Sequence, residues 1–129
     1  YVWPTDTHYE GNNDSLVLLM TYGPFKALFT GDLEEQGEKV LIRQEGANIA
    51  NIDILKAGHH GSKTSSSEVF IEHVKPRLTI FMAGKDNRYG HPHAEVVDRL
   101  KSRNLPYLTT GEDGTIEVRM NKHRMKVSK

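Results

Sequence analysis

The sequence predicts one α/β domain across its 129 residues. Short apolar runs alternate with longer segments in which apolar residues recur at helical spacing, a pattern typical of strands connected by helices. Gly and Pro residues separate these segments, and neither an internal repeat nor a low-complexity linker interrupts them. We therefore expect the order β-β-α-β-α-β-α-β-β, with the helices covering one face of a sheet.

The first half of the chain is expected to contain three strands and one helix. The strands are predicted over residues 15–22, 25–30 and 53–57. Gly23 and Pro24 form a turn between the first two strands, which predicts a hairpin. The helix is expected over residues 33–45, because acidic residues in its first turn suit the positive end of a helix dipole. Residues 1–14 lack periodicity and are predicted to be an entering loop.

The second half is expected to contain two helices and three strands. The helices are predicted over residues 65–74 and 93–103, and the strands over residues 78–83, 105–109 and 115–120. Ser65 and Glu68 match the Ser-x-x-Glu capping box, which opens the first of these helices, and Pro76 ends it. Residues 111–114 are predicted to be a turn, and the basic segment 121–129 a frayed tail.

Composition and charge limit the function classes. With 17 basic and 17 acidic residues, the chain has no formal net charge. A nucleic-acid binder usually has a basic excess, so any such role must rest on a local patch or on a metal ion. The lack of Cys excludes disulfides and a thiolate zinc site. The longest apolar run, residues 16–20, is too short to span a bilayer. Because the chain opens at Tyr1 rather than Met, we expect it to be part of a longer protein.

Carboxylate and imidazole side chains follow three of the predicted strands. Asp32 comes directly after the second strand, and His59 and His60 come after the third. His91 follows the fourth strand through a polar loop. Donor groups at successive strand ends, on one edge of a sheet, are how a protein builds a metal site on a rigid scaffold. This arrangement predicts a metallohydrolase.

Each of these residues also has a plainer interpretation. Asp32 is either a metal ligand or the N-cap of the following helix. The two histidines are either ordinary loop residues or a functional pair. In an extended backbone the rings of His59 and His60 point to opposite sides, so only one would ligate the first ion and the other would contact substrate or serve a second ion. The flanking Gly58 and Gly61 permit unusual dihedrals and close approach by a ligand.

Two further candidates lie in the loops. Lys63 precedes a helix whose free N–H groups favour an anion such as phosphate, so it is either an anion-binding group or a solvated surface charge. His91 is either a general acid or substrate-binding imidazole, or the solvated ring of a rigid turn. His93 is expected to cap the helix that follows it. The remaining histidines are interpreted as incidental surface residues: His8, His73 and His123.

Taken together, four segments resemble the metallo-β-lactamase superfamily, and within it the hydrolase domain of the ComEC-type DNA-internalization competence proteins. The matching segments are residues 12–18, 28–32, 53–65 and 87–92. The block Gly-His-His-Gly-Ser-Lys-Thr-Ser at residues 58–65, in this order with the other three, is the most specific part. The likeness covers residues 2–118, nearly the whole chain.

The resemblance implies a four-layer αβ/βα sandwich that holds one or two divalent metal ions between its sheets. Oxygen and nitrogen ligands without thiolate permit Mn²⁺ or Zn²⁺ alike. It implies that Asp32 bridges the ions and that one of His59 and His60 is a late ligand while the other contacts substrate. Asn12 or Asn13 sits near where many relatives carry a further ligand His. The superfamily's His-x-His-x-Asp-His signature is not found in this sequence. We therefore expect residues 1–129 to be a single partial domain, the C-terminal half of the sandwich.

The resemblance further implies a metal-dependent phosphodiesterase or nuclease within a bacterial cell-membrane protein that takes up transforming DNA. Asp32, His60 and His59 are the expected metal ligands, and His91, His59 and Lys63 the expected catalytic residues. The expected partners are single-stranded DNA or another phosphodiester, the missing N-terminal half of the domain, and a membrane channel segment. The isolated fragment is expected to be soluble. It is also expected to be inactive, because it lacks the three or four ligands that a metal site usually needs.

Two alternatives remain open at this point. One is a soluble relative that hydrolyses another phosphodiester, a lactone or a thioester. The other is a structural remnant that packs against a partner without metal. The sequence that precedes the domain would distinguish the soluble relative from a competence protein, since only a competence protein carries many apolar spans upstream of the domain. Retained metal affinity in the complete domain would argue against the second.

We predict that the 129-residue chain self-associates, because half of a sandwich exposes the sheet face that normally packs on the other half. Light scattering at increasing protein concentration measures this directly. A monodisperse monomer at all concentrations would contradict the prediction.

Overall fold

A computed structural model describes residues 2–4 and 9–129 and contains one mixed six-stranded sheet and a separate hairpin. The strands are β1 (Val2–Trp3), β2 (Val17–Tyr22), β3 (Phe25–Phe29), β4 (Ile54–Lys56), β5 (Leu78–Phe81), β6 (Tyr107–Thr109), β7 (Glu117–Met120) and β8 (Met125–Ser128). The helices are α1 (Glu35–Glu45), α2 (Glu68–Val74), α3 (Ala94–Ser102) and α4 (Thr110–Asp113), with 3-10 turns η1 (Gly11–Asn13) and η2 (Gly58–Gly61). The predicted α/β class is confirmed, and the nine expected elements occur in the expected order.

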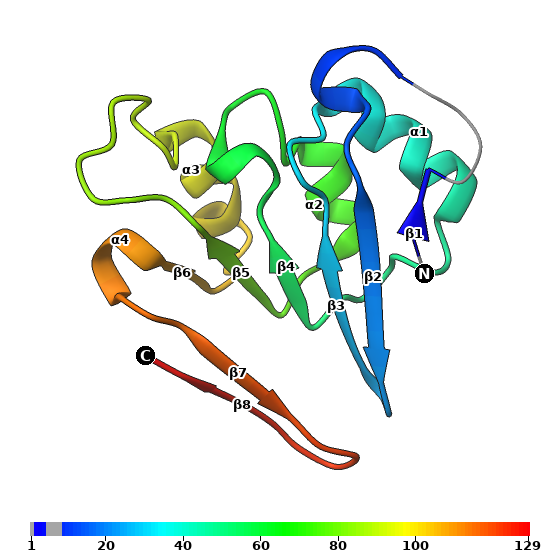
Figure 1. Ribbon diagram of the computed structural model, residues 1–129, viewed down its shortest axis with the longest axis vertical. Coiled ribbons are helices and arrows are strands. Elements are labelled where there is room, and N and C mark those ends of the chain that lie inside the picture. Colours follow the sequence, from blue (N-terminus) through cyan, green and yellow to red (C-terminus); the bar gives the residue numbers. More distant parts are fainter. Residues whose placement is uncertain (1, 5–8) are drawn as a thin grey trace.

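The large sheet has the strand order β1-β2-β3-β4-β5-β6. Strands β1 to β3 are antiparallel, and β3 to β6 are parallel. Helices α1, α2 and α3 make the crossovers between the parallel strands, as parallel pairing requires. The carboxyl ends of β3, β4 and β5 therefore meet at one edge of the sheet (Figure 1). Within the described part of the chain, no helix has the length and apolar character needed to cross a bilayer.

The two faces of the sheet carry separate apolar clusters. On one face, α1, α2 and α3 cover the larger cluster, which includes Leu28, Leu55 and Phe81. On the other face, which we call the open face, Ile54 and Ile80 belong to a smaller cluster against the β7–β8 hairpin. Figure 1 shows the helices and this hairpin on opposite sides of the sheet. Large apolar side chains are still exposed on the open side, among them Leu18, Met20, Tyr22, Phe29 and Met82.

Both terminal segments differ from the sequence prediction. Part of the expected entering loop, residues 1–14, forms β1, which pairs with β2, and the 3-10 turn η1. The expected frayed tail, residues 121–129, contains β8, which pairs antiparallel with β7. Met125 and Val127 face the open-face cluster while Lys126 is exposed, so this segment alternates with the period of a strand. Its many basic residues obscured that alternation in the sequence. The predicted turn at 111–114 lies largely within α4.

A buried carboxylate organises the start of α2. Glu38 on α1 is 1% exposed, and its two carboxylate oxygens accept hydrogen bonds from the N–H groups of Ser66 (2.6 Å) and Ser67 (3.0 Å). Burial raises the pKa of Glu38, and these hydrogen bonds oppose that effect. Ser67 is the N-cap, with its hydroxyl accepting from the Phe70 N–H (3.3 Å). The helix therefore begins after Ser67, and the predicted capping box from Ser65 is wrong.

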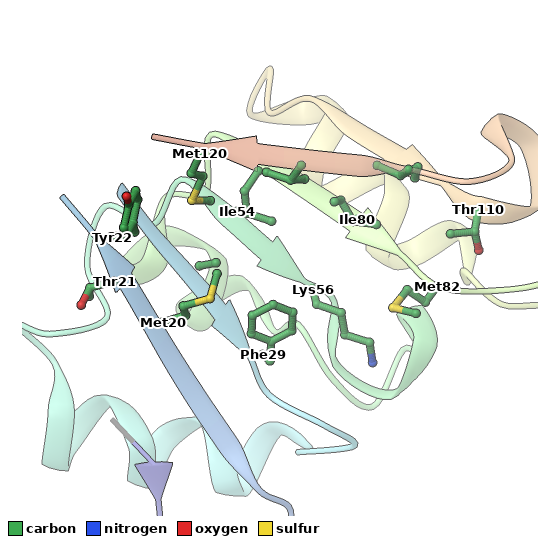
Figure 2. Close-up of a pocket in the computed structure, with 13 residues that line it drawn as sticks. Met20, Thr21, Tyr22, Phe29, Ile54, Lys56, Ile80, Met82, Thr110 and Met120 are labelled. Atoms are coloured by element: carbon green, nitrogen blue, oxygen red, sulfur yellow. The ribbon is translucent and has the colours of Figure 1, made fainter. Parts of the chain in front are cut away.

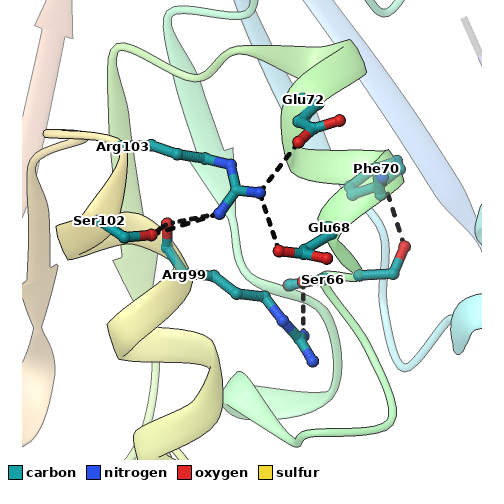
Figure 3. Close-up of polar contacts among 8 residues, drawn as sticks. Ser66, Glu68, Phe70, Glu72, Arg99, Ser102 and Arg103 are labelled. Carbon is teal, nitrogen blue, oxygen red and sulfur yellow. Dashed lines mark hydrogen bonds and ion pairs between the residues drawn. The ribbon is translucent and has the colours of Figure 1, made fainter.

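Arginines on α3 hold α2 from the other side. The Arg99 guanidinium donates to the Ser66 carbonyl (3.0 Å). Arg103 forms ion pairs with Glu68 (3.0 Å) and Glu72 (2.9 Å) on α2 (Figure 3). These carboxylates are exposed, so each pair stabilises the fold only modestly. Together the two arginines fix the end of α3 against α2 and against the loop that precedes it.

We expect Glu38→Gln to destabilise the protein by about 1–2 kcal/mol, because a carboxamide offers only one acceptor oxygen and leaves the Ser66 or Ser67 N–H unpaired. Urea denaturation followed by circular dichroism measures the change in the free energy of unfolding. Glu35→Gln on the same helix is the matched control, with an expected loss of no more than about 0.5 kcal/mol, since the carboxylate of Glu35 forms an exposed ion pair with Lys39. Equal stability of the Glu38→Gln variant and the wild type would contradict the prediction and show that relief of carboxylate burial offsets the lost hydrogen bond.

Candidate functional site

Loops at the carboxyl ends of three parallel strands line one cavity of about 500 Å³. Asp32 follows β3, the pair His59 and His60 follows β4, and His91 lies in the long loop after β5. The structure thus brings together the four residues that strand-end reasoning singled out. The other residues that line the cavity are Met82, Ala83, Gly84, Asn87 and Tyr89.

Asp32 is held by a tight turn against the start of β2. Gly31 has a φ of +58°, and a Cβ there would lie 3.2 Å from the Ser15 Cβ. The Asp32 N–H donates to the Ser15 hydroxyl (3.1 Å). Asp32 is not the N-cap of α1, because that helix begins three residues later at Glu35. This excludes the capping alternative and leaves the carboxylate directed to the cavity.

The cap of α1 comes instead from a distant residue. The side-chain oxygen of Asn13 accepts hydrogen bonds from the N–H groups of Glu34 (3.0 Å) and Gly37 (3.1 Å). A segment remote in sequence therefore satisfies the first turn of the helix. Because its oxygen is used in this way, Asn13 has a structural task, and neither Asn13 nor Asn12 lines the cavity. No local pattern in the sequence signals this contact.

The two adjacent histidines share the cavity because their backbone is not extended. His59 (φ 46°, ψ 43°) and His60 (φ 56°, ψ 21°) are both left-handed, which the sequence analysis did not expect. The extended backbone that would turn their rings to opposite sides is therefore not present, and both residues line the cavity. The His59 N–H donates to the Gly31 carbonyl (2.9 Å), which ties this turn to the Asp32 loop. At Gly61 (φ +90°), a Cβ would lie 2.6 Å from the Pro92 Cβ, so only glycine fits there.

His60 is oriented in a way that suits metal binding. Its Nδ1 lies 2.8 Å from the Met82 carbonyl, which can only accept, so Nδ1 carries the proton. Nε2 of the neutral ring is then an unprotonated donor atom, and it lies 3.9 Å from Oδ1 of Asp32. Metal-binding histidines commonly donate their other ring N–H to a carbonyl in this way. Two bonds of about 2.0–2.2 Å at a tetrahedral angle place their donor atoms about 3.3–3.6 Å apart, so a closure of a few tenths of an ångström would let this pair share an ion.

The opposite wall of the cavity is a cluster of rings. The rings of His59 and His91 meet edge to face at 5.8 Å, and Tyr89 stacks on His91 at 5.6 Å. Nδ1 of His59 is buried and has no hydrogen-bond partner among the described residues. The pKa of His91 is lowered from its ordinary 6.5, first by desolvation and then by the neighbouring histidines His93, His59 and His60, while Asp32 opposes this effect. His91 is thus kept neutral near pH 7.

His93 holds two loops together instead of capping α3 with its side chain. It occupies the N-cap position, but its ring makes no capping hydrogen bond. Nδ1 accepts from the Lys63 N–H (2.9 Å), so Nε2 carries the proton and donates to the Tyr89 carbonyl (3.0 Å). Asn87 orders the same loop by accepting from the N–H groups of Tyr89 (3.1 Å) and His91 (3.0 Å). The sequence analysis missed these roles, which depend on contacts between loops.

Lys63 and the start of α2 differ in part from the anion-binding expectation. Lys63 is exposed and does not line the cavity, so its catalytic role stays a prediction. The Ser66 and Ser67 N–H groups are occupied by Glu38, the chain's own anion. The helix start is therefore not free for phosphate. A cation that the sequence analysis missed, Lys56, lies half-buried at the end of β4, where burial lowers its pKa and Asp32 opposes that effect.

The other described histidines do not line the cavity. His73 was interpreted as a surface residue, but it is half-buried and its Nε2 lies 2.6 Å from the Gly46 carbonyl. It therefore joins the end of α2 to the end of α1. His123 is exposed, as expected. His8 lies outside the described residues.

The donor set fits part of a metal site. Asp32 offers a carboxylate and His60 an unprotonated imidazole nitrogen, while the buried Nδ1 of His59 lacks a partner among the described residues. Oxygen and nitrogen donors suit zinc or manganese. Over residues 2–4 and 9–129, however, no three His, Cys, Asp or Glu side chains lie close enough to hold an ion together. A complete site would need further ligands.

We expect His91 to titrate below pH 6.5, and Asp32→Asn to lower its pKa further, since Asp32 supplies the negative charge that favours the imidazolium. Ring proton chemical shifts followed by NMR across pH 4–8 measure both values. His60→Gln should change the pKa of His91 in the opposite direction, because His60 is one of the neighbours that lower it. A rise in the pKa after Asp32→Asn would show that Asp32 does not act on His91 in this cavity.

Comparison with known proteins places the chain among homologues that are much longer. No family model matches it. It is 47% identical over 111 residues, 84% of its length, to ComE operon protein 3 of Bacillus subtilis (strain 168), of which it covers 14%. It is 34% identical over 116 residues, 90% of its length, to Recombination protein 2 of Haemophilus influenzae, of which it covers 14%. It is 33% identical over 120 residues, 93% of its length, to Competence protein ComA of Neisseria gonorrhoeae, of which it covers 17%. The chain is therefore a homologue of one segment of ComE operon protein 3 and of its competence-related relatives, Recombination protein 2 and ComA.

Proposed function

We propose that this chain supplies part of the metal centre of a phosphodiesterase or nuclease domain in a competence protein. The observation that carries the proposal is the pair formed by Asp32 and His60. Their donor atoms lie 3.9 Å apart, and the Met82 carbonyl fixes the His60 ring in the tautomer that leaves Nε2 free. An ordinary loop histidine needs no such arrangement, whereas a metal ligand does.

The residues of the cavity have distinct tasks in this proposal. Asp32, His60 and, through its unpartnered Nδ1, His59 would hold Mn²⁺ or Zn²⁺, in the complete domain as one or two ions. The ion would supply an activated water and stabilise the negative charge that develops on the phosphoryl oxygens. His91 is neutral near pH 7, so its ring N–H can bind a phosphate oxygen. A proton for the leaving group would come from its imidazolium form, which is the minor form at that pH. Lys63 would offset substrate charge from the rim.

The relatives support a role in competence and a larger assembly. One of them is named a competence protein, and each of the three is several times longer than this chain. We propose that the missing ligands come from the preceding half of a metallo-β-lactamase-like sandwich in the longer protein. A membrane channel segment of the same protein would deliver single-stranded DNA, the proposed substrate. The apolar side chains at the β2 end of the open face, such as Leu18, are the proposed site of self-association in the separate chain.

One observation favours a second candidate. The described residues provide no group of three close ligands, as expected of a domain that has lost its metal and serves as a structural remnant. A third possibility within the same fold is hydrolysis of another phosphodiester, a lactone or a thioester. Measurements of metal binding and of DNA cleavage separate these candidates.

We expect the longer protein, with the sequence that precedes this chain, to cleave single-stranded DNA with Mn²⁺ or Zn²⁺, and Asp32→Asn to slow cleavage at least about 100-fold because it removes a charged ligand. Asp98→Asn on α3 is the matched control and should keep full activity, since Asp98 is exposed and outside the cavity. Metal binding without DNA cleavage would shift the substrate to another ester. No metal binding would favour the structural remnant.

A further inference from the structure

Tyr89 is the exposed member of the ring cluster in the wall of the cavity. It is 59% exposed, whereas His91 and His59 are half-buried. The Tyr89 ring stacks on His91 with the ring planes 27° apart, and His91 meets His59 edge to face. The three rings therefore form a series from the rim of the cavity inward, toward the wall that carries Asp32. Most of the tyrosine surface is left uncovered by the fold, and an aromatic ring is a surface on which another planar ring can stack.

The backbone that carries this ring is held in place on both sides. The Tyr89 N–H donates to the Asn87 side-chain oxygen (3.1 Å), and the Tyr89 carbonyl accepts from Nε2 of His93 (3.0 Å). The Asn87 amide nitrogen donates to the Gly84 carbonyl (2.9 Å), which closes the loop on itself. A ring on an ordered backbone loses little conformational freedom when a ligand packs on it. Tyr89 is thus prepared to bind a planar group.

A cation lies over the same ring. Cζ of Arg88 is 4.7 Å from the ring centre, and its guanidinium donates to the Tyr89 hydroxyl. At an exposed position a cation–π contact is weaker than the stacking of a base on an aromatic ring, so a base can displace the guanidinium. The freed Arg88 can then pair with a phosphate. The loop also exposes Lys85 as a second cation against one carboxylate, Asp86, so its net charge favours an anionic ligand.

The loop of Tyr89 lies outside the open face, on which the preceding half of the sandwich would pack. The apolar pocket between the open face and the β7–β8 hairpin belongs to that face, and its walls include Met20, Phe29 and Met120 (Figure 2). The loop after β5 instead extends beyond the end of that strand (Figure 1). Asp32 is reached at this same edge of the sheet, so a substrate must pass the rim that Tyr89 forms. The ring therefore stays accessible in the longer protein.

We propose that Tyr89 stacks the base next to the phosphate that Asp32 and His60 would hold. The inference rests on the proposed function and narrows its substrate to a nucleic acid, because a lactone, a thioester or an alkyl phosphodiester carries no planar base. Stacking on a side chain requires a base whose face is free, so the ligand is a single strand rather than the interior of a duplex. Every base has such a face, so binding does not depend on sequence.

The test is photocross-linking of an oligothymidylate that carries one 5-iodouracil to the longer protein in EDTA. On irradiation this base couples to an aromatic side chain that it contacts, so the yield at one residue reports that contact and not binding elsewhere. We expect the cross-link at Tyr89, and a yield at least about tenfold lower at this position in Tyr89→Ala. Tyr89→Trp keeps a ring and should restore the yield. Val69→Ala on α2 removes another exposed apolar side chain, away from the cavity lining, and should cross-link as the wild type does.

A strand without bases separates stacking from a disturbed loop. In fluorescence anisotropy with EDTA, Tyr89→Ala should bind oligothymidylate about tenfold more weakly than the wild type, and an abasic oligomer equally well. Tyr89→Phe should bind oligothymidylate within about twofold of the wild type, whereas Tyr89→Leu should not, because it is apolar but lacks a ring. An equal loss for both oligomers would overturn the proposal, as would the absence of a cross-link at Tyr89.

The proposed function is tested separately in the same preparation. Calorimetry measures whether the longer protein binds Mn²⁺, a property that does not involve Tyr89. Metal binding without a cross-link at Tyr89 would overturn only the stacking inference. A cross-link at Tyr89 without metal binding would support stacking and count against the metal centre.

Discussion

One hydrogen bond, from the His59 N–H to the Gly31 carbonyl, joins the ends of two neighbouring parallel strands, and the geometry of the candidate site depends on it. The strands themselves set only where the chain leaves the sheet. The bond draws the chain after β4 back toward the Asp32 loop, into left-handed conformations that non-glycine residues seldom adopt. The close packing of Gly58 and Gly61 against their neighbours accommodates this turn. Both imidazoles consequently face the same cavity as the carboxylate.

The loops around this turn are held by atoms that the chain itself provides. Glu38 supplies the negative charge at the start of α2, and His93 joins the loop after β4 to the loop after β5. The Met82 carbonyl orients His60. Met82 also lines the apolar pocket between the open face and the β7–β8 hairpin. A site assembled from three loops is thereby given a defined geometry, as donor groups require if they are to act together.

The sequence was sufficient to predict the order of the elements, because apolar runs mark strands. It was also sufficient to predict the four residues that meet in the cavity, because parallel strands end at a common edge. It was insufficient wherever a contact crosses between distant segments. Asn13 caps α1, and Glu38 accepts a hydrogen bond from the backbone that leads into α2. No local pattern in the sequence reveals either contact. The arrangement of His59 and His60 was not predicted, because it depends on a left-handed backbone at both residues. Strand β8 was missed because its basic residues outweighed its apolar alternation.

The chain carries four methionines and a single tryptophan, and the fold sorts them onto opposite sides of the sheet. Three methionines line the apolar pocket between the open face and the β7–β8 hairpin: Met20, Met82 and Met120. Met125 packs against the open-face cluster beside this pocket. Trp3 is buried in the cluster under the helices and donates to Gln44 (2.6 Å). Labelled methionine methyl groups would thus report on the open face alone, and indole fluorescence on the helix-covered core alone. The two layers of the domain can be followed separately in one sample without introducing a foreign probe.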